Sequence, residues 1–332
     1  MRIKNFIFLT LINIFFNAFV YSNDTYFFIS GGNLVPTSEK DTLIEMSSEK
    51  ININLQDNYY EVTVDFMFYN PDKDVDLTVG FPFYQVGYEG HGKIWDFKCW
   101  TNGQETDFTS EPIEKNWEKT TDLEYVNARI IHFPAKEFTN TRVYFKSEYG
   151  DSAPSFRIAN YLYGTGSSWN KPIGSILLKI ENNIKYGILR NVKMENTKYL
   201  TNQLTKTSDN TFELLLYNIE PKNYTDYFEI EISDVLSNDG PKAFPAYFYF
   251  NKKILNKSEF KWFRKDQLRL VRNAIYALHG YKFKSKDLEE YFSSVGKYWN
   301  PPYTINPNFS ENDLSEIEKE NIKNLLEEEN KR

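Results

Sequence analysis

The chain has 332 residues, a formal net charge of −7 and aromatic side chains at 17% of its positions. A chain of this length can bury a large core without covalent staples, and its acidic balance argues against sustained attraction to nucleic acid or anionic lipid. The abundant Phe and Tyr favour a β-rich fold, because rings fit the pleated, half-buried surface of strands. An alternative use for them is a surface on which sugar rings stack.

Residues 1–22 are predicted to be an export signal. Arg2 and Lys4 precede a mostly apolar run from 6 to 20, and short side chains follow as far as Ser22. These are the features that a signal peptidase recognises, so we expect cleavage after Ser22. The apolar run is shorter than the roughly 20 residues of a membrane span. The alternative is an uncleaved anchor, which would be the chain's one contact with a membrane.

Residues 23–240 are predicted to be β-structure. The clearest strand is 60–68, where every second residue from Tyr60 to Phe68 is apolar and the residues between them are polar except for Met67. Shorter runs of the same kind occur at 51–55, 176–180, 212–216 and 228–232. One apolar and one polar face, repeated with short turns, are typical of antiparallel sheets packed face to face. We therefore expect an antiparallel β-sandwich, or two sandwiches that form subdomains.

Two turn motifs and the single cysteine lie in this region. Asn70-Pro71-Asp72 follows the clearest strand, and Asn102-Gly103 is typical of a tight hairpin because both residues tolerate positive φ. Cys99 is the single cysteine, so the chain has no internal disulfide. Since its neighbours in sequence include no base, we predict a buried strand residue rather than a nucleophile.

The segment 151–172 is rich in Ser, Gly and Asn, and we predict a long loop there. It contains Tyr161, Tyr163 and Trp169. We expect these rings to fold back onto the sandwich, and the alternative is that they bind a ligand.

The pattern changes beyond a predicted linker at 241–257. In 258–332 apolar residues recur about every 3.6 positions, which is typical of helices. We expect a first helix from Asp266, its N-cap, to Gly280, a second from Ser285 to about Phe292, and a third from about Leu314. The first has an apolar face of Leu268, Val271, Ala274, Ile275 and Leu278. The third has an apolar side of Ile317, Ile322, Leu325 and Leu326 and a solvated side of Glu316, Glu318, Lys319 and Lys323.

His279 is predicted to lie in the last turn of the first helix. A cation there is stabilised by the negative end of the helix dipole, and the ring can donate to a free carbonyl of that turn. Both roles are structural. The alternative is a proton-transfer pair with Tyr276, one turn earlier. The candidate binding residues are Arg272, Asn273, Tyr276, His279 and Trp299, and we predict no catalytic residue.

The run RNAIYALHGYKF, residues 272–283, resembles the signature of the YARHG domain, a small bacterial domain expected outside the cell. The resemblance continues in LEEYF at 288–292, YWNP at 298–301 and LSEIEKENI at 314–322. Leu278 stands where the family has its arginine, which removes a cation from the helix. The resemblance implies a three-helix module and an accessory role in the envelope, but no reaction.

The region 23–83 resembles, more weakly, an uncharacterised family of exported bacterial β-rich domains. The resemblance rests on the residues GGNL at 31–34, IEM at 44–46 and FYNPDKDV at 68–75, leading to GFP at 80–82. It implies a strand, a turn and a strand in a sandwich, and no known activity.

The sequence predicts neither a metal site nor a cofactor. His91, His132 and His279 lie far apart, and none has a second ligand at zinc spacing. The glycine-containing runs 88–92 and 164–168 match neither a phosphate loop nor a nucleophile elbow. We therefore expect an exported, periplasmic or extracellular protein that binds a cell-wall or envelope component without catalysis. The alternatives are an exported hydrolase with a site assembled near His279, and a purely architectural helical tail.

Overall fold

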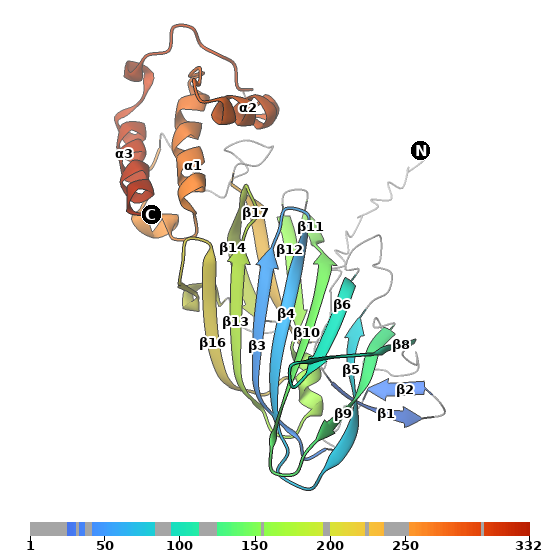
Figure 1. The fold of residues 1–332 in the computed structure, drawn as a ribbon. Helices are drawn as coiled ribbons and strands as arrows, with labels where there is room; N and C mark the ends of the chain where they lie inside the picture. Colours follow the sequence, from blue (N-terminus) through green and yellow to red (C-terminus); the bar gives the residue numbers. More distant parts are fainter. Residues whose placement is uncertain are drawn as a thin grey trace, which may run out of the picture.

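The computed structural model describes residues 25–30, 33–36, 42–83, 94–112, 125–153, 156–194, 200–222, 226–235, 252–299 and 302–332. They form three β-sheets followed by three α-helices (Figure 1), which confirms the predicted class of a mainly β protein with a small helical module. The predicted export signal, most of the predicted linker and His91 lie outside the described residues.

The largest sheet has the strand order β15-β16-β13-β3-β4-β10-β6-β7. Its strands are β3 (Glu45–Leu55), β4 (Tyr59–Tyr69), β6 (Ile94–Thr101), β7 (Gln104–Thr106), β10 (Phe138–Glu148), β13 (Ile173–Asn182), β15 (Thr205–Lys206) and β16 (Thr211–Ile219). The alternation predicted for 60–68 is confirmed, since every second side chain of β4 is buried. The β3–β13 pair is parallel, since the chain reaches β13 only after forming strands of the other sheets. The alternation of side chains within a strand does not predict this direction.

Two smaller sheets cover one face of the largest sheet. The first has the order β2-β1-β5-β9-β8, with β1 (Thr25–Ser30), β2 (Asn33–Pro36), β5 (Val75–Phe83), β8 (Thr109–Pro112) and β9 (Tyr125–Phe133). The second has the order β11-β12-β17-β14, with β11 (Gly150–Ala153), β12 (Phe156–Leu162), β14 (Gly187–Met194) and β17 (Tyr227–Asp234). All three share one hydrophobic core.

The segment predicted as a long loop contains a strand, β12, and a short 3₁₀ helix, η2 (Gly164–Ser168), so that prediction is wrong. Tyr161 and Trp169 are fully buried. The Trp169 ring lies 4.5 Å from that of Phe68 on β4 and 6.0 Å from that of Phe133 on β9, between centroids. The polar composition of the segment hides the strand, because several of its polar residues, such as Asn160 and Ser168, are buried in the fold. The Ser168 hydroxyl of η2 donates to the carbonyl of Thr165.

The local signals are confirmed. Asn102 and Gly103 have φ values of 48° and 83° and join β6 to β7 as a hairpin. Cys99 is a fully buried strand residue. The buried Asn70 holds the turn after β4, because its amide donates to the carbonyls of Lys73 and Phe133 while its oxygen accepts from the Asp72 N–H.

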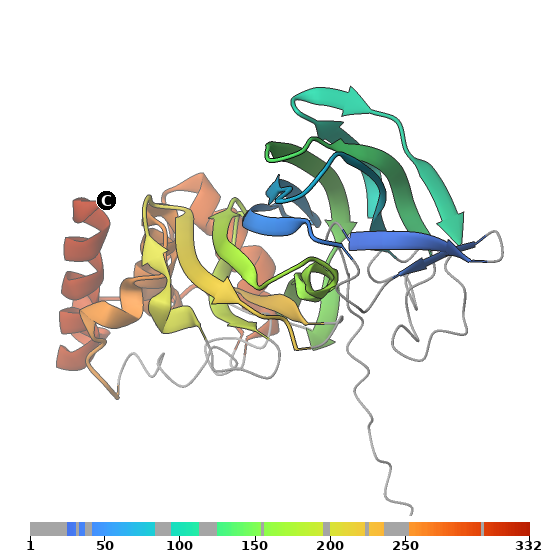
Figure 2. The same ribbon diagram turned by 90° about the horizontal axis from the view of Figure 1, so that it is seen from below.

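The helices are α1 (Lys265–Leu278), α2 (Lys286–Val295) and α3 (Glu316–Lys331), with short 3₁₀ turns η3 (Thr201–Gln203), η5 (Lys257–Phe260), η6 (Gly296–Tyr298) and η7 (Glu311–Asp313). Figures 1 and 2 place them beside β16, away from β1 and β2. Gly280 has a φ of 77°, as expected after a helix. Within the described part of the chain, no helix is both long enough and apolar enough to cross a membrane.

Two details of α1 differ from the sequence prediction. The N-cap is Arg264 rather than Asp266, and the Gln267 side chain accepts from the Arg264 N–H at 3.0 Å. Asp266 instead pairs with the Arg264 guanidinium at 3.1 Å. Leu278 is 40% exposed, whereas the other apolar residues of the predicted face are buried. The hydrophobic face of α1 therefore ends one turn earlier than the spacing predicts.

Candidate functional site

The helical module is joined to the β-sheets by side chains that bond to backbone carbonyls. Arg264, immediately before α1, donates to the carbonyls of Asn182 and Lys185 at 3.1 and 3.0 Å. The fully buried Gln267 donates to the carbonyl of Gly187 at 2.7 Å. Lys261 donates to the carbonyl of Leu204 at 3.0 Å. Because buried carbonyls need partners, these bonds fix how α1 sits on the end of the β-structure.

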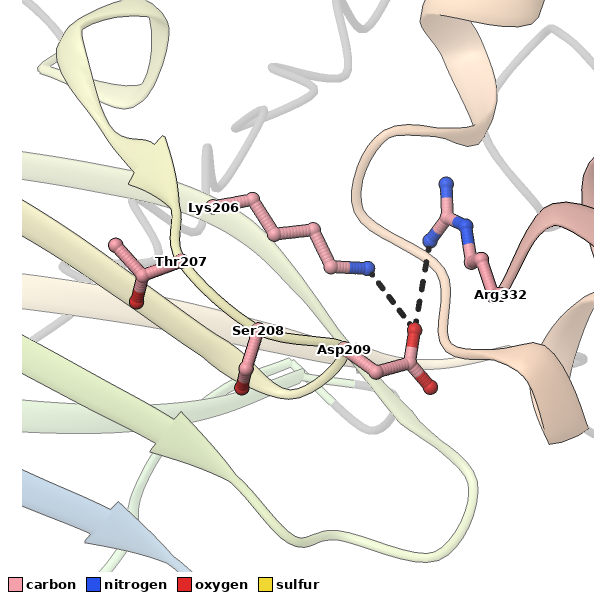
Figure 3. Close-up of a pocket in the computed structure, with 5 residues that line it drawn as sticks. All are labelled: Lys206, Thr207, Ser208, Asp209 and Arg332. Atoms are coloured by element: carbon pink, nitrogen blue, oxygen red, sulfur yellow. Dashed lines mark hydrogen bonds and ion pairs between the residues drawn. The ribbon is translucent and has the colours of Figure 1, made fainter.

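An open pocket of about 390 Å³ lies at this junction and is lined by Lys206, Thr207, Ser208, Asp209 and Arg332. Figure 3 shows Lys206 and Arg332 converging on Asp209 from the two parts of the chain, at 3.3 and 3.8 Å. Lys206 also donates to the carbonyl of Phe263 at 2.9 Å, and Arg332 donates to the carbonyls of Phe260 and Phe263. The two cations therefore serve the junction itself, since most of their donors are occupied by acceptors of the chain.

The pKa of Lys206 is lowered to about 8, chiefly by burial and then by the nearby Arg332 cation, although Asp209 and Glu328 oppose the shift. The folded state thus disfavours the ammonium form. Between about pH 8 and about 10.5 the unfolded chain binds more protons than the folded chain, so stability should rise with pH across this window. We expect Lys206→Met to flatten the rise, measured by urea unfolding at a series of pH values. An unchanged pH profile would contradict this effect of Lys206.

Three of the sequence-predicted site residues lie along one stripe of α1. Arg272, Tyr276 and His279 are spaced by four and three positions, and this stripe approaches α3. The Arg272 guanidinium pairs with Glu329 at 2.9 Å. The Tyr276 ring packs against those of Tyr281 and Phe309, 5.7 and 6.3 Å away between centroids. Burial and the Glu311 charge raise the pKa of Tyr276, which keeps the phenol neutral.

His279 is the C-cap of α1, and its Nε2 lies 2.9 Å from Oε1 of Glu318. Glu318 is 3% exposed, so the prediction that it is solvated is wrong. Its Oε2 accepts from both the N–H and the hydroxyl of Ser315, which is the N-cap of α3. Burial raises the pKa of Glu318, but the hydrogen bonds from His279 and Ser315 outweigh it, and the net pKa is lowered. One carboxylate thus ties the end of α1 to the start of α3.

The other two predicted residues are elsewhere in the module. The Asn273 amide donates to the Arg269 carbonyl one turn earlier, at 2.7 Å. Trp299 is 3% exposed and packs against Phe292, with ring centroids 5.8 Å apart. Neither residue is brought to the His279 stripe by these contacts. The structure therefore assembles three of the five residues.

The sequence contained a signal for the missing partner. Ser315 followed three positions later by Glu318 is the capping-box spacing, in which the glutamate turns back onto the start of its helix. It then lies within reach of any group that packs against that helix end. The described residues include no cluster of metal-ligating side chains. Chemically, the Glu318 carboxylate can orient the His279 imidazole. Among the described residues, no nucleophilic side chain is hydrogen-bonded to that ring.

No curated protein sequence matches the chain. A crystal structure from Legionella pneumophila subsp. pneumophila str. Philadelphia 1, of a protein with the provisional name nutrient binding protein, is similar with a TM-score of 0.52 and 18% identity. The match covers 94% of this chain and 98% of that chain and concerns the fold. An M1 zinc metallopeptidase from Deinococcus radiodurans matches 58% of this chain and 42% of its own, with 8% identity and a TM-score of 0.29. That likeness is too low to carry an argument.

The C-terminal part of the chain is matched by a family model. The matched residues, 246–330, contain all of α1 and α2 and nearly all of α3. This confirms the resemblance noted in the sequence, including the blocks on either side of His279. Residues 246–330 of this chain match the YARHG domain.

Proposed function

We propose that this chain is an exported, envelope-associated protein that binds a ligand without catalysis. The observation that carries the proposal is the agreement in fold, along 94% of this chain, with the Legionella pneumophila protein provisionally named for nutrient binding. The YARHG match supports a role outside the cytoplasm, as the resemblance implies.

A structural role for the polar groups of α1 supports the non-catalytic part. His279 is bonded to Glu318, and Arg272 is bonded to Glu329. Such charge pairs between helices are explained without a substrate, since each side chain satisfies the other. A side chain that is already paired in this way has few hydrogen bonds left to offer a ligand unless the pair opens.

The second candidate is an exported hydrolase centred on His279. It is favoured by one observation, the His279–Glu318 pair, because catalytic imidazoles are commonly oriented by a carboxylate. The two candidates differ in what the loss of His279 does. A hydrolase would lose turnover, whereas a binding protein would lose only stability of the helical module.

The binding proposal is tested by fractionating cells that express the full chain and by passing the purified chain over envelope fractions. We expect the chain in the exported fraction and retained by at least one of three materials: peptidoglycan sacculi, membrane vesicles or soluble periplasmic extract. Recovery of the full chain from the cytoplasm alone, or passage through all three without retention, would contradict the proposal. The His279→Ala variant should be retained to the same extent as the parent chain.

A further inference from the structure

The largest sheet has an outer face that the two smaller sheets do not cover. In Figure 1 its strands lie in front of β12 and β17, which pack on the opposite, apolar face. Successive side chains of a strand point to opposite faces. The residues of β4 that alternate with its buried set therefore face outward, and they are intermediate in exposure, as Tyr59 and Glu61 show.

Polar side chains form a hydrogen-bonded row that begins just outside the ends of β16 and β13 and continues on the outer face of β3, β4 and β10. Asn210 donates to Asn183 at 2.7 Å, Asn183 donates to Asn54 at 2.6 Å, and Asn54 donates to Glu61 at 2.9 Å. The Tyr144 hydroxyl donates to the other oxygen of Glu61 at 3.1 Å. An amide offers two donors and two acceptor lone pairs, so this row keeps hydrogen-bonding capacity for a ligand.

Aromatic rings stand at one end of the row because β6 carries a bulge. Lys146 lies opposite Trp95 and Tyr144 lies opposite Lys98, so β6 has one extra residue between these pairs. Asp96 is within the bulge and has a φ of 58°, a left-handed conformation that is uncommon for a non-glycine residue. Bulges re-aim side chains, and this one places Trp95 and Asp96 beside Lys146.

The contacts around the bulge are specific. The rings of Trp95 and Tyr59 meet edge to face, with centroids 5.9 Å apart. Lys146 lies over the Tyr59 ring, 5.9 Å from its centroid, and pairs with Asp96 at 3.0 Å. Rings and polar groups thus form one surface, which we name the aromatic patch. It comprises Asn54, Tyr59, Glu61, Trp95, Asp96, Tyr144 and Lys146.

The charges of the patch favour an uncharged occupant. Within the patch Lys146 pairs with Asp96 and Glu61 leaves one negative charge, which the neighbouring Lys98, outside the patch, offsets. A polyanion such as nucleic acid would gain no net attraction there. An extended peptide is disfavoured over β3, β4 and β10, because the backbone groups of these strands are paired on both sides, whereas added strands bind at sheet edges.

Sugar rings match both the aromatic rings and the polar groups of the patch. Each has apolar C–H faces that stack on aromatic rings and hydroxyls that pair with amides and carboxylates. Adjacent strands are about 4.8 Å apart, so a polymer of small rings laid across them would meet a new strand at about each ring. We propose that the aromatic patch binds a neutral glycan strand running across β3, β4, β10 and β6. This inference deepens the proposed binding function and rests on it, since it names the ligand class.

The test uses the purified full chain, titrated with soluble N-acetylglucosamine tetramer and co-sedimented with peptidoglycan sacculi. Binding should change the tryptophan fluorescence, and Trp95→Ala should weaken affinity for the tetramer by about tenfold or more. Asn54→Ala should weaken it several-fold. Tyr217→Ala is the matched control, because Tyr217 is a 65% exposed ring on β16 of the same sheet, outside the patch. It should bind like the parent chain.

The outcomes separate this inference from the proposed function. If the parent chain binds neither glycan, or if folded Trp95→Ala binds as tightly as the parent, the patch is not a glycan site. Retention on membrane vesicles or periplasmic extract would then leave the binding function standing with another ligand. If neither the parent chain nor the patch variants were retained on any envelope fraction, both the glycan site and the proposed binding function would be contradicted. Thermal unfolding of each variant shows whether a loss of binding is a loss of fold.

Discussion

Replacing Trp169 by alanine is expected to lower the free energy of unfolding by about 3–5 kcal/mol, the range for large aromatic residues removed from a core. Trp169 is fully buried, and its ring contacts Phe68 of the largest sheet and Phe133 of the five-stranded sheet. Its loss would leave a cavity at the point where these sheets meet. Urea unfolding followed by circular dichroism measures the change.

The matched control is Trp100→Ala. Trp100 is an interior strand residue of β6 but lies on its outer face, opposite Arg142, and is only half-buried. Its loss leaves no enclosed cavity, so we expect about 1 kcal/mol or less. If Trp169→Ala were as mild as this control, Trp169 would not be a core residue, and a ligand-binding aromatic loop in 151–172 would again need to be considered.

The second large effect is expected at Glu318. Glu318→Ala removes the capping box of α3, worth about 1 kcal/mol, and leaves the half-buried His279 and the exposed Ser315 without their acceptor. The two losses together should lower the free energy of unfolding by about 2–3 kcal/mol. His279→Ala should cost less, about 1 kcal/mol, because Glu318 keeps its bonds to Ser315.

The pH dependence of this effect has a definite sign. The folded-state pKa of Glu318 is lowered, so the carboxylate stabilises the fold above its unfolded-state pKa. That contribution is lost as the pH falls through the lower folded-state pKa. Glu318→Gln cannot ionise and should therefore lose less stability on acidification than the parent chain. Unfolding curves at neutral and acidic pH compare the two, and equal losses in both proteins would show that the carboxylate is not stabilised in this way.

The same variants separate structure from catalysis. If His279 serves a hydrolase, His279→Ala should abolish hydrolysis by the purified chain while its stability changes little. If His279 serves the junction between α1 and α3, stability falls and the amount of bound envelope material does not. His132 is a useful control, since it also lies 2.7 Å from a carboxylate, that of Asp76, but on an exposed surface. His132→Ala should alter neither property.

Much of the fold could be predicted because its signals are local. The alternation of β4, the hairpin at Asn102-Gly103 and the helix end at Gly280 each depend on the side chains and backbone freedom of adjacent residues. The three helices were found within a few residues for the same reason. Their amphipathic spacing is a property of the segment itself.

The candidate site could be predicted only in part. The sequence correctly placed His279 at a helix end, and the structure supplied Glu318, which lies 39 residues later. A solvated glutamate and a buried, bonded one have the same local pattern, and only the packing of α3 against α1 distinguishes them. The aromatic patch is a stronger case, since its members come from four separate strands and from a bulge that no local motif announces.

By itself the sequence determined the class of the fold, its main strands and helices, and the likeness of the C-terminal module to the YARHG domain. The tertiary structure alone decided that 156–162 is a buried strand, that β3 and β13 run parallel, and that Glu318 faces His279. The physical reason is that periodicity and turn chemistry act between neighbours in sequence. Burial, pairing and the loss of water around a charge depend on which distant segments meet.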